Sequence, residues 1–167
     1  NIHGVFYTKT TNKDGVADLG IMFRPGTYIL TAYNPVTGEE KGFNITVKSL
    51  IVQSDLTKYY LNASRFEATV YNKDGSLAVN KNVTFNINGV FYTKTTNDKG
   101  IAMMSINLNP GKYVITAINL VTGEQSGNNI TVKSLIVQND LTKYYLNASR
   151  FQTTIYNKDG SLAANKE

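Results

Sequence analysis

Hydrophobic and polar residues alternate along much of this chain with a period of two, which is typical of half-buried β-strands. In one such segment, Phe66, Ala68 and Val70 share a face, and the residues between them fall on the other. A second apolar row lies further along the chain, at Ala102, Met104, Ile106 and Leu108. No segment has the helical period, so the pattern predicts an all-β protein.

The dipeptide Asn88-Gly89 is the strongest short hairpin signal in the sequence. Both residues tolerate the positive φ that a two-residue turn between antiparallel strands requires. Such a turn sets Ile87 opposite Val90 and Phe85 opposite Tyr92, with all four on one face of the hairpin.

Turn signals divide residues 50–133 into seven extended pieces, at the spacing of about 8–12 residues that is typical of all-β sandwiches. The pieces lie at 50–60, 66–71, 83–87, from Val90 onward, 102–108, 113–117 and 129–132. This order predicts a seven-stranded antiparallel β-sandwich of immunoglobulin-like type.

The chain repeats itself. Residues 4–12 return as 89–97 with the same sequence, an offset of about 85 residues, which is close to the length of one small all-β domain. The sequence therefore predicts tandem sandwich repeats with a period of 85 residues.

Placed on this period, residues 1–48 are the C-terminal part of one repeat, 49–134 a complete repeat and 135–167 the N-terminal part of the next. The first segment would supply the last four strands of a sandwich, and the third segment the first two. Because open sheet edges favour added strands, we expect 135–167 of one copy to pack against 1–48 of a neighbouring copy, head to tail. The junction could be covalent, within a longer repeat protein, or could join separate subunits.

Three motifs occur in both copies: Gly-Val-Phe-Tyr-Thr-Lys-Thr-Thr, Pro-Gly-x-Tyr and Val-Thr-Gly-Glu. With these motifs the whole chain resembles the bacterial-type immunoglobulin-like repeats of large adhesin-like surface proteins of methanogenic archaea. The resemblance implies an extracellular, glycosylated stalk at the cell surface, whose modules hold a binding region away from the cell. It does not identify a ligand.

Charge and composition exclude several classes of function. The net charge of +5 is spread along the chain rather than clustered, so no nucleic-acid partner is expected. Cysteine is absent, which excludes disulfides, thiolate metal sites and a cysteine nucleophile. No apolar run approaches the length of a membrane span.

No catalytic or metal site is expected either. His3, the sole histidine, has Asn88 as its repeat counterpart, and Glu67 corresponds to Gln152. The turns at 72–76 and 157–161 loosely resemble calcium loops, but they lack the carboxylates that such loops use, so plain turns are favoured. We expect no enzyme and no cofactor.

Five asparagines lie in Asn-x-Ser/Thr triplets and are candidate glycosylation sites. They are Asn44, Asn62, Asn82, Asn129 and Asn147. All five are predicted to be exposed, and Asn62 and Asn147 are the favoured acceptors because they lie in polar links.

Lys58, Lys94 and Lys143 are candidates for a lysine–asparagine isopeptide bond, which requires a buried lysine, a neighbouring asparagine and an acid. Lys94 falls on the core side of its hairpin. The recurrent acid at Glu39 and Glu124 has the character of a loop residue, so surface lysines are the favoured interpretation.

Tyrosine pairs offer a second kind of candidate site, a stacking platform for sugars. They are Tyr59, Tyr60, Tyr144 and Tyr145. Strand alternation points one ring of each pair inward, which leaves one exposed ring per repeat, too few for a carbohydrate site. Tyr28 and Tyr113 are instead predicted to pack in the core with their hydroxyls reaching a loop.

These observations predict a non-catalytic structural repeat of an extracellular adhesin stalk or surface filament, with neighbouring repeats as its partners. The alternative is a carbohydrate- or cell-wall-binding module with surface glycans as partners, and an accessory domain of an enzyme is a further rival.

Overall fold

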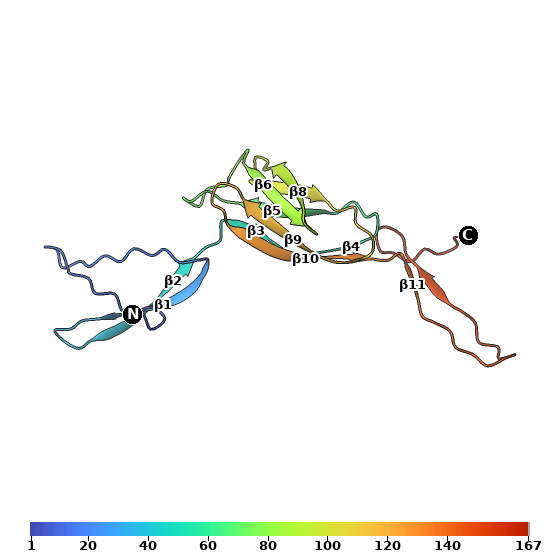
Figure 1. The fold of residues 1–167 in the computed structure, drawn as a ribbon, viewed down its shortest axis with the longest axis horizontal. Coiled ribbons are helices and arrows are strands. Elements are labelled where there is room, and N and C mark those ends of the chain that lie inside the picture. The colour runs from blue at the N-terminus through green and yellow to red at the C-terminus, as the bar shows by residue number, and fades with distance from the viewer. Residues whose placement is uncertain (167) are drawn as a thin grey trace. The chain divides into compact units, whose positions relative to one another are not determined.

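The structure is a computed structural model that describes residues 1–166. All regular secondary structure in this part of the chain is β, as predicted (Figure 1). The chain divides into two compact units, residues 1–49 and the residues from 50 onward.

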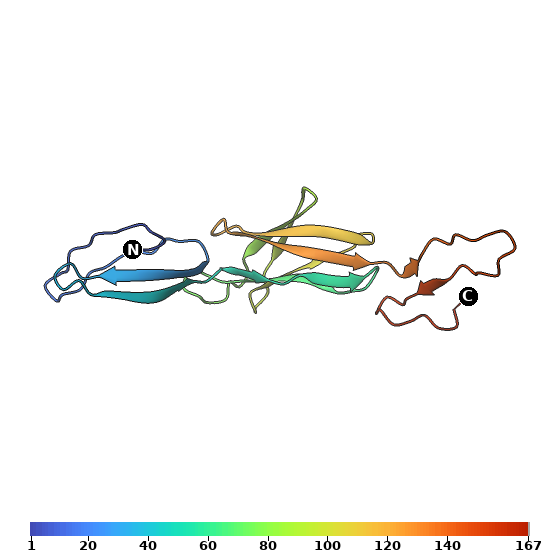
Figure 2. The same cartoon turned by 90° about the horizontal axis from the view of Figure 1, so that it is seen from below.

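The first unit contains one antiparallel hairpin, β1 (Gly26–Tyr33) with β2 (Glu40–Val47). Figure 2 shows its two strands side by side, in blue and teal. Ile2, which bridges to Leu30, is the buried hydrophobic residue of this unit.

The second unit contains the remaining strands. These are β3 (Ile51–Gln53), β4 (Leu56–Tyr59), β5 (Arg65–Val70), β6 (Asn82–Ile87), β7 (Val90–Thr95), β8 (Ile101–Ser105), β9 (Gly111–Asn119), β10 (Gln125–Lys133), β11 (Ile136–Gln138) and β12 (Thr153–Ile155). One sheet has the order β4-β10-β9-β6-β7, a second has the order β3-β5-β8, and β11 pairs with β12. The five-stranded and three-stranded sheets form a sandwich-like arrangement over residues 50–133, here called the middle sandwich.

The core of the middle sandwich confirms the alternating pattern. Phe66, Ala68 and Val70 on β5 are buried, and so are Ala102, Met104 and Ile106 of the second apolar row. The other core residues are Ile51, Ala78, Val83, Phe85, Ile87, Ile115, Ala117, Ile130 and Val132. The burial of these side chains from both sheets provides the main driving force for folding.

The predicted hairpin register is also confirmed, with Ile87 paired to Val90 and Phe85 to Tyr92. Asn88 and Gly89 have φ values of 52° and 80°, as a two-residue turn of this type requires. The predicted common face is buried only on β6. Val90 and Tyr92 remain exposed, because β7 is the edge strand of its sheet.

One part of the strand prediction was wrong. The first predicted piece, 50–60, is divided into β3, which belongs to the three-stranded sheet, and β4, which belongs to the five-stranded sheet. β4 runs parallel to β10, from Leu56 opposite Ile130 to Tyr59 opposite Lys133, so the sandwich is not purely antiparallel. The chain keeps its direction as it crosses between the sheets, and it therefore meets β10 running the same way.

The pairing of β3 with β5 recurs further along the chain, between β11 and β12. β11 pairs with β12 from Ile136 opposite Ile155, and β3 pairs with β5 from the corresponding Ile51 opposite Val70. Corresponding segments of the two copies thus pair in the same register. The division into 1–48, 49–134 and 135–167 stays a prediction. The ranges 1–48 and 135–167 are here called the first and third segments.

Candidate functional site

The third segment exposes residues that the middle sandwich buries. Phe66 is 1% exposed, whereas its counterpart Phe151 is 54% exposed. Ile51 is 2% exposed, whereas Ile136 is 55% exposed. The first segment behaves in the same way at Ala32, which is exposed although its counterpart Ala117 is fully buried. These open apolar faces are the main candidate interaction surfaces of the chain.

Asp55 holds the chain at the crossing between β3 and β4. Its carboxylate accepts hydrogen bonds from the main-chain N of Asn129 at 2.8 Å, from Asn128 Nδ2 at 2.9 Å and from Asn129 Nδ2 at 3.2 Å. These bonds, that of the Asn129 main chain first, hold the pKa of Asp55 below its ordinary value of 3.8. The carboxylate therefore fastens β4 beside β10.

We expect Asp55→Asn to destabilise the middle sandwich at neutral pH, and the difference from the wild type to shrink on acidification. Because the folded-state pKa is lowered, the stabilising contribution of Asp55 is present above pH 3.8 and is lost as the pH falls through the folded-state pKa. Urea unfolding at pH 7 and at pH 3 measures this difference. The control is Asp140→Asn at the corresponding position of the third segment, measured at concentrations where the chain is monomeric. A difference that does not depend on pH would contradict the prediction.

Lys58 connects the two sheets. It is 5% exposed, and its Nζ donates to the main-chain oxygens of Ser64 at 3.1 Å and Ile106 at 2.9 Å. Burial lowers the pKa of the Lys58 ammonium. Lys58 lies on β4, whereas Ser64 and Ile106 flank β5 and β8 of the other sheet. The favoured interpretation of a surface lysine is therefore wrong at Lys58.

The hydrogen-bond partners of Lys58 are main-chain carbonyls, and neither is the asparagine side chain that an isopeptide bond requires. Lys143, the counterpart of Lys58, is exposed, and its Nζ donates to Ser149 O at 3.1 Å. Lys94 pairs with Val83 as predicted but is exposed. The structure thus buries one of the three candidate lysines.

Glu124, for which the sequence indicates only a loop position, has a structural role. It lies in the connection between β9 and β10, and its Oε2 accepts a hydrogen bond at 2.9 Å from the main-chain N of Leu50, just before β3. Its role was signalled by its recurrence as Glu39 in the other copy. The sequence does not single out Asp55, which also recurs, as Asp140, because recurrence alone does not indicate its hydrogen-bond partners.

The tyrosine pairs do not form an exposed platform in the middle sandwich. Tyr60 is half-buried against the core, and Tyr59 packs on Tyr156 with ring centroids 5.4 Å apart. Tyr144 and Tyr145 are exposed. The hydroxyls of Tyr28 and Tyr113 donate to the carbonyls of Arg24 at 2.7 Å and Asn109 at 2.9 Å, as predicted.

Four of the five candidate glycosylation sites are exposed as predicted, namely Asn44, Asn82, Asn129 and Asn147. Asn62 is only half-buried, contrary to the expectation of an exposed side chain. Its Nδ2, the atom to which a glycan would be attached, donates to Lys158 O at 2.9 Å. Glycosylation itself stays a prediction at all five positions.

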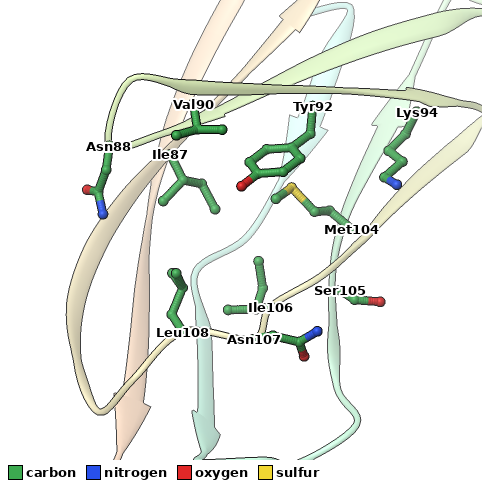
Figure 3. A pocket seen from close by; sticks show the side chains of 10 residues that line it. All are labelled: Ile87, Asn88, Val90, Tyr92, Lys94, Met104, Ser105, Ile106, Asn107 and Leu108. Atoms are coloured by element: carbon green, nitrogen blue, oxygen red, sulfur yellow. The ribbon is translucent and has the colours of Figure 1, made fainter.

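A groove of about 350 Å³ opens between β7 and β8 at the edge of the middle sandwich. Figure 3 shows Tyr92 and Lys94 on one side of it, and Met104 and Ile106 on the other. The remaining lining residues are Ile87, Asn88, Val90, Ser105, Asn107 and Leu108. The groove exists because β7 is the edge strand of one sheet and β8 that of the other.

The turns at 72–76 and 157–161 satisfy their own polar groups. Asp74 Oδ1 accepts from the hydroxyl of Ser76 at 2.6 Å and from its main-chain N at 2.9 Å, and these bonds lower the pKa of Asp74. The described residues contain no group of three or more histidine, cysteine or acidic side chains that could hold a metal ion. Nor does this part of the chain contain a helix that is long and apolar enough to cross a membrane.

No known protein family and no curated protein sequence matches the chain. One similar solved structure is the Bacteroides ovatus mixed-linkage glucan utilization locus protein SGBP-B in complex with a mixed-linkage heptasaccharide. It is 11% identical, with a TM-score of 0.34, over 78% of this chain and 35% of that one. Another is the surface layer protein SbsC, domains 4–9. It is 14% identical, with a TM-score of 0.33, over 92% of this chain and 31% of that one. The chain therefore spans about a third of the length of each structure.

Proposed function

We propose that the chain is a non-catalytic structural repeat of an extracellular adhesin stalk or surface filament, in which sandwiches are completed head to tail. One observation supports this most strongly: residues that the middle sandwich buries are exposed at the corresponding positions of the third segment. Covering them removes apolar surface from water, which is favourable by roughly 25 cal/mol for each Å². The partner that fits is another copy of the same repeat, since it carries the complementary strands.

The middle sandwich gives the register that such a junction would have. There, β4 pairs in parallel with β10, from Leu56 opposite Ile130. By repeat correspondence, Leu141 of the third segment would lie opposite Ile45 of a neighbouring first segment. The junction would then add a parallel strand to the β1–β2 hairpin, just as β4 adds one to the β9–β10 pair.

Two polar contacts of the middle sandwich have counterparts at this junction, with one partner in the third segment and the other in the neighbouring first segment. Lys143 already binds Ser149 O, as Lys58 binds Ser64 O, and the counterpart of its second acceptor, Ile106, is Ile21 of the first segment. In the same way, Asp140 would meet the main chain of Asn44, the counterpart of Asn129. The proposed contact is therefore specific in its polar groups as well as in its apolar area.

The resemblance to archaeal adhesin-like repeats supports a place at the cell surface, and the exposed Asn-x-Ser/Thr sites fit glycosylation there. A carbohydrate-binding module has less support, because Tyr59 and Tyr60 are half-buried in the middle sandwich, and Tyr144 and Tyr145 are exposed only in the third segment, which the proposed junction would complete.

Self-association tests the proposal in separate chains. We expect the mass measured by light scattering to rise with protein concentration, and Phe151→Asp to keep the chain monomeric, because a charge would enter the apolar junction. The control is Val121→Asp, since Val121 is 62% exposed and lies in a turn of the middle sandwich. If the mass of the Phe151→Asp variant rises with concentration as that of the wild type does, strand complementation between subunits is contradicted.

A covalent junction needs its own test. Two copies can be joined through Val-Thr-Phe, the triplet at 83–85 that separates residue 82 from residue 86 in the middle repeat. We expect hydrogen exchange at the main-chain amide of Phe151 in the first copy to slow at least tenfold relative to the single chain, because a complete sandwich protects it. If the Phe151 amide exchanges equally fast in the joined copies and in the single chain, and the single chain stays monomeric, the proposal that neighbouring copies complete a sandwich is overturned.

A further inference from the structure

A contact between consecutive repeats is already present inside the second unit. Tyr59, at the end of β4, packs its ring on Tyr156 of the following repeat, with an angle of 34° between the ring planes. Asn62 Nδ2 donates to Lys158 O at 2.9 Å. Lys133 Nζ lies 5.5 Å from the centroid of the Tyr59 ring, within the range of a cation–π interaction.

Gly160 shows how closely Tyr59 approaches the turn at 157–161. A Cβ added at Gly160 would lie 2.4 Å from Cε2 and 2.8 Å from Cδ2 of Tyr59. The φ of Gly160 is +90°, so glycine also suits the backbone there. Only a residue without a side chain leaves space for the ring.

The equivalent turn at 72–76 is built in the same way but has no ring against it. Asn72 N donates to Ser76 O at 2.8 Å, as Asn157 N donates to Ser161 O at 2.8 Å. Gly75 has a φ of +85°, yet a Cβ there would meet nothing within 4 Å. The turn is thus formed by its own sequence, and the docked ring is an addition to it.

We propose that Tyr59 and Asn62 on one side, and the turn at 157–161 on the other, form a joint that fixes the orientation of consecutive repeats. Each repeat carries both surfaces. In this chain, Tyr144 and Asn147 are left free for a following repeat of like sequence, and the turn at 72–76 for a preceding one. A chain of such joints is directional and makes the array stiffer than one whose repeats are connected only by Lys133–Leu135.

The joint also assigns a role to Asn62 that competes with modification. Glycosylation leaves one N–H on Nδ2, but Nδ2 lies 2.9 Å from Lys158 O, so a sugar attached to it needs the space that the turn at 157–161 occupies. The Oδ1 of Asn62 accepts from the main-chain N and the hydroxyl of Ser64, at 2.8 Å and 2.6 Å. Asn147 accepts the same two bonds from Ser149. A glycan at Asn62 would open the joint, whereas one at Asn147 leaves this joint closed.

This inference goes beyond the proposed function, and its test is independent of it, because both surfaces of the joint belong to one chain. The chain has no cysteine, so spin labels can be placed at Lys112→Cys and Gln152→Cys, two exposed positions on opposite sides of the joint. Double electron–electron resonance then gives the distribution of distances between the labels. Measurements are made at concentrations where light scattering finds only monomer.

We expect Gly160→Ala to broaden the distance distribution at least twofold, because its methyl group collides with the Tyr59 ring. Gly75→Ala has the same backbone strain without the collision, and it should leave the width unchanged. Equal widths in these two variants would overturn the proposed joint. If Gly160→Ala fails to fold, Asn62→Asp takes its place with Asn147→Asp as control, since aspartate keeps the acceptor for Ser64 and removes the donor to Lys158. Equal widths in that pair overturn the joint as well.

Discussion

Replacing Phe66 with alanine should lower the free energy of unfolding of the middle sandwich by about 3–5 kcal/mol. Phe66 is 1% exposed, and its ring stands edge-on to that of Phe85 with centroids 5.8 Å apart. The two rings come from facing sheets, because β5 belongs to one sheet and β6 to the other. Truncation therefore leaves a cavity at the contact between the layers, and a small domain has little stability to spare.

Urea unfolding followed by far-ultraviolet circular dichroism measures this change, and hydrogen exchange at the amide of Phe85 locates it. Phe151→Ala provides a control with the same substitution in an equivalent sequence. Because Phe151 is 54% exposed, it should cost about 0.5 kcal/mol or less when the chain is monomeric. Equal losses from the two variants would mean that the third segment is already part of a packed core.

Much of the middle sandwich could be predicted because its signals are local. The alternation around Phe66 marks a half-buried strand without knowledge of its neighbours. Asn88-Gly89 fixes both the turn and the register of β6 and β7, since a two-residue turn leaves one way to pair the strands. The repeat then carries each local conclusion to a second position, as the equal ladders of β3–β5 and β11–β12 demonstrate.

The crossing at Asp55 could not be predicted, because it depends on contacts far away in the sequence. Nothing next to Asp55 indicates that Asn128 and Asn129 will hold its carboxylate, or that the chain changes sheets there. The hydrogen bond of Asn62 could not be predicted for the same reason. The Asn62 triplet reads as a glycosylation site, and only the folded chain places the Asn62 amide beside Lys158.

The sequence favours a surface position for Lys58 for a related reason. Its own strand gives no indication of Ile106 O, which lies just after β8 of the other sheet. A lysine in an apolar environment is costly unless its ammonium is hydrogen-bonded, so the sequence alone favours exposure. The structure provides two carbonyl acceptors, and the hydrogen bonds of Lys58 to them connect the two sheets.

Lys58→Met should therefore destabilise the middle sandwich by about 1–3 kcal/mol at pH 7, since the buried carbonyl of Ile106 loses its donor. Methionine keeps most of the aliphatic stem, so the change reports mainly on the ammonium. Lys143→Met is the matched control. Lys143 is exposed and donates to one carbonyl only, so Lys143→Met should lower the free energy of unfolding of the monomer by no more than about 0.5 kcal/mol.

The pH dependence separates the role of the charge from that of the hydrogen bonds. Burial lowers the pKa of Lys58 in the folded state below its ordinary 10.5, so the unfolded chain binds more protons between the two values. Stability due to Lys58 therefore rises as the pH increases towards 10.5, and the difference between wild type and Lys58→Met should grow over this range. Urea unfolding at pH 7, 9 and 10 measures that difference, and titrations common to both proteins cancel. A difference that shrinks at alkaline pH would show that the charged ammonium, rather than its hydrogen bonds, holds the two sheets together.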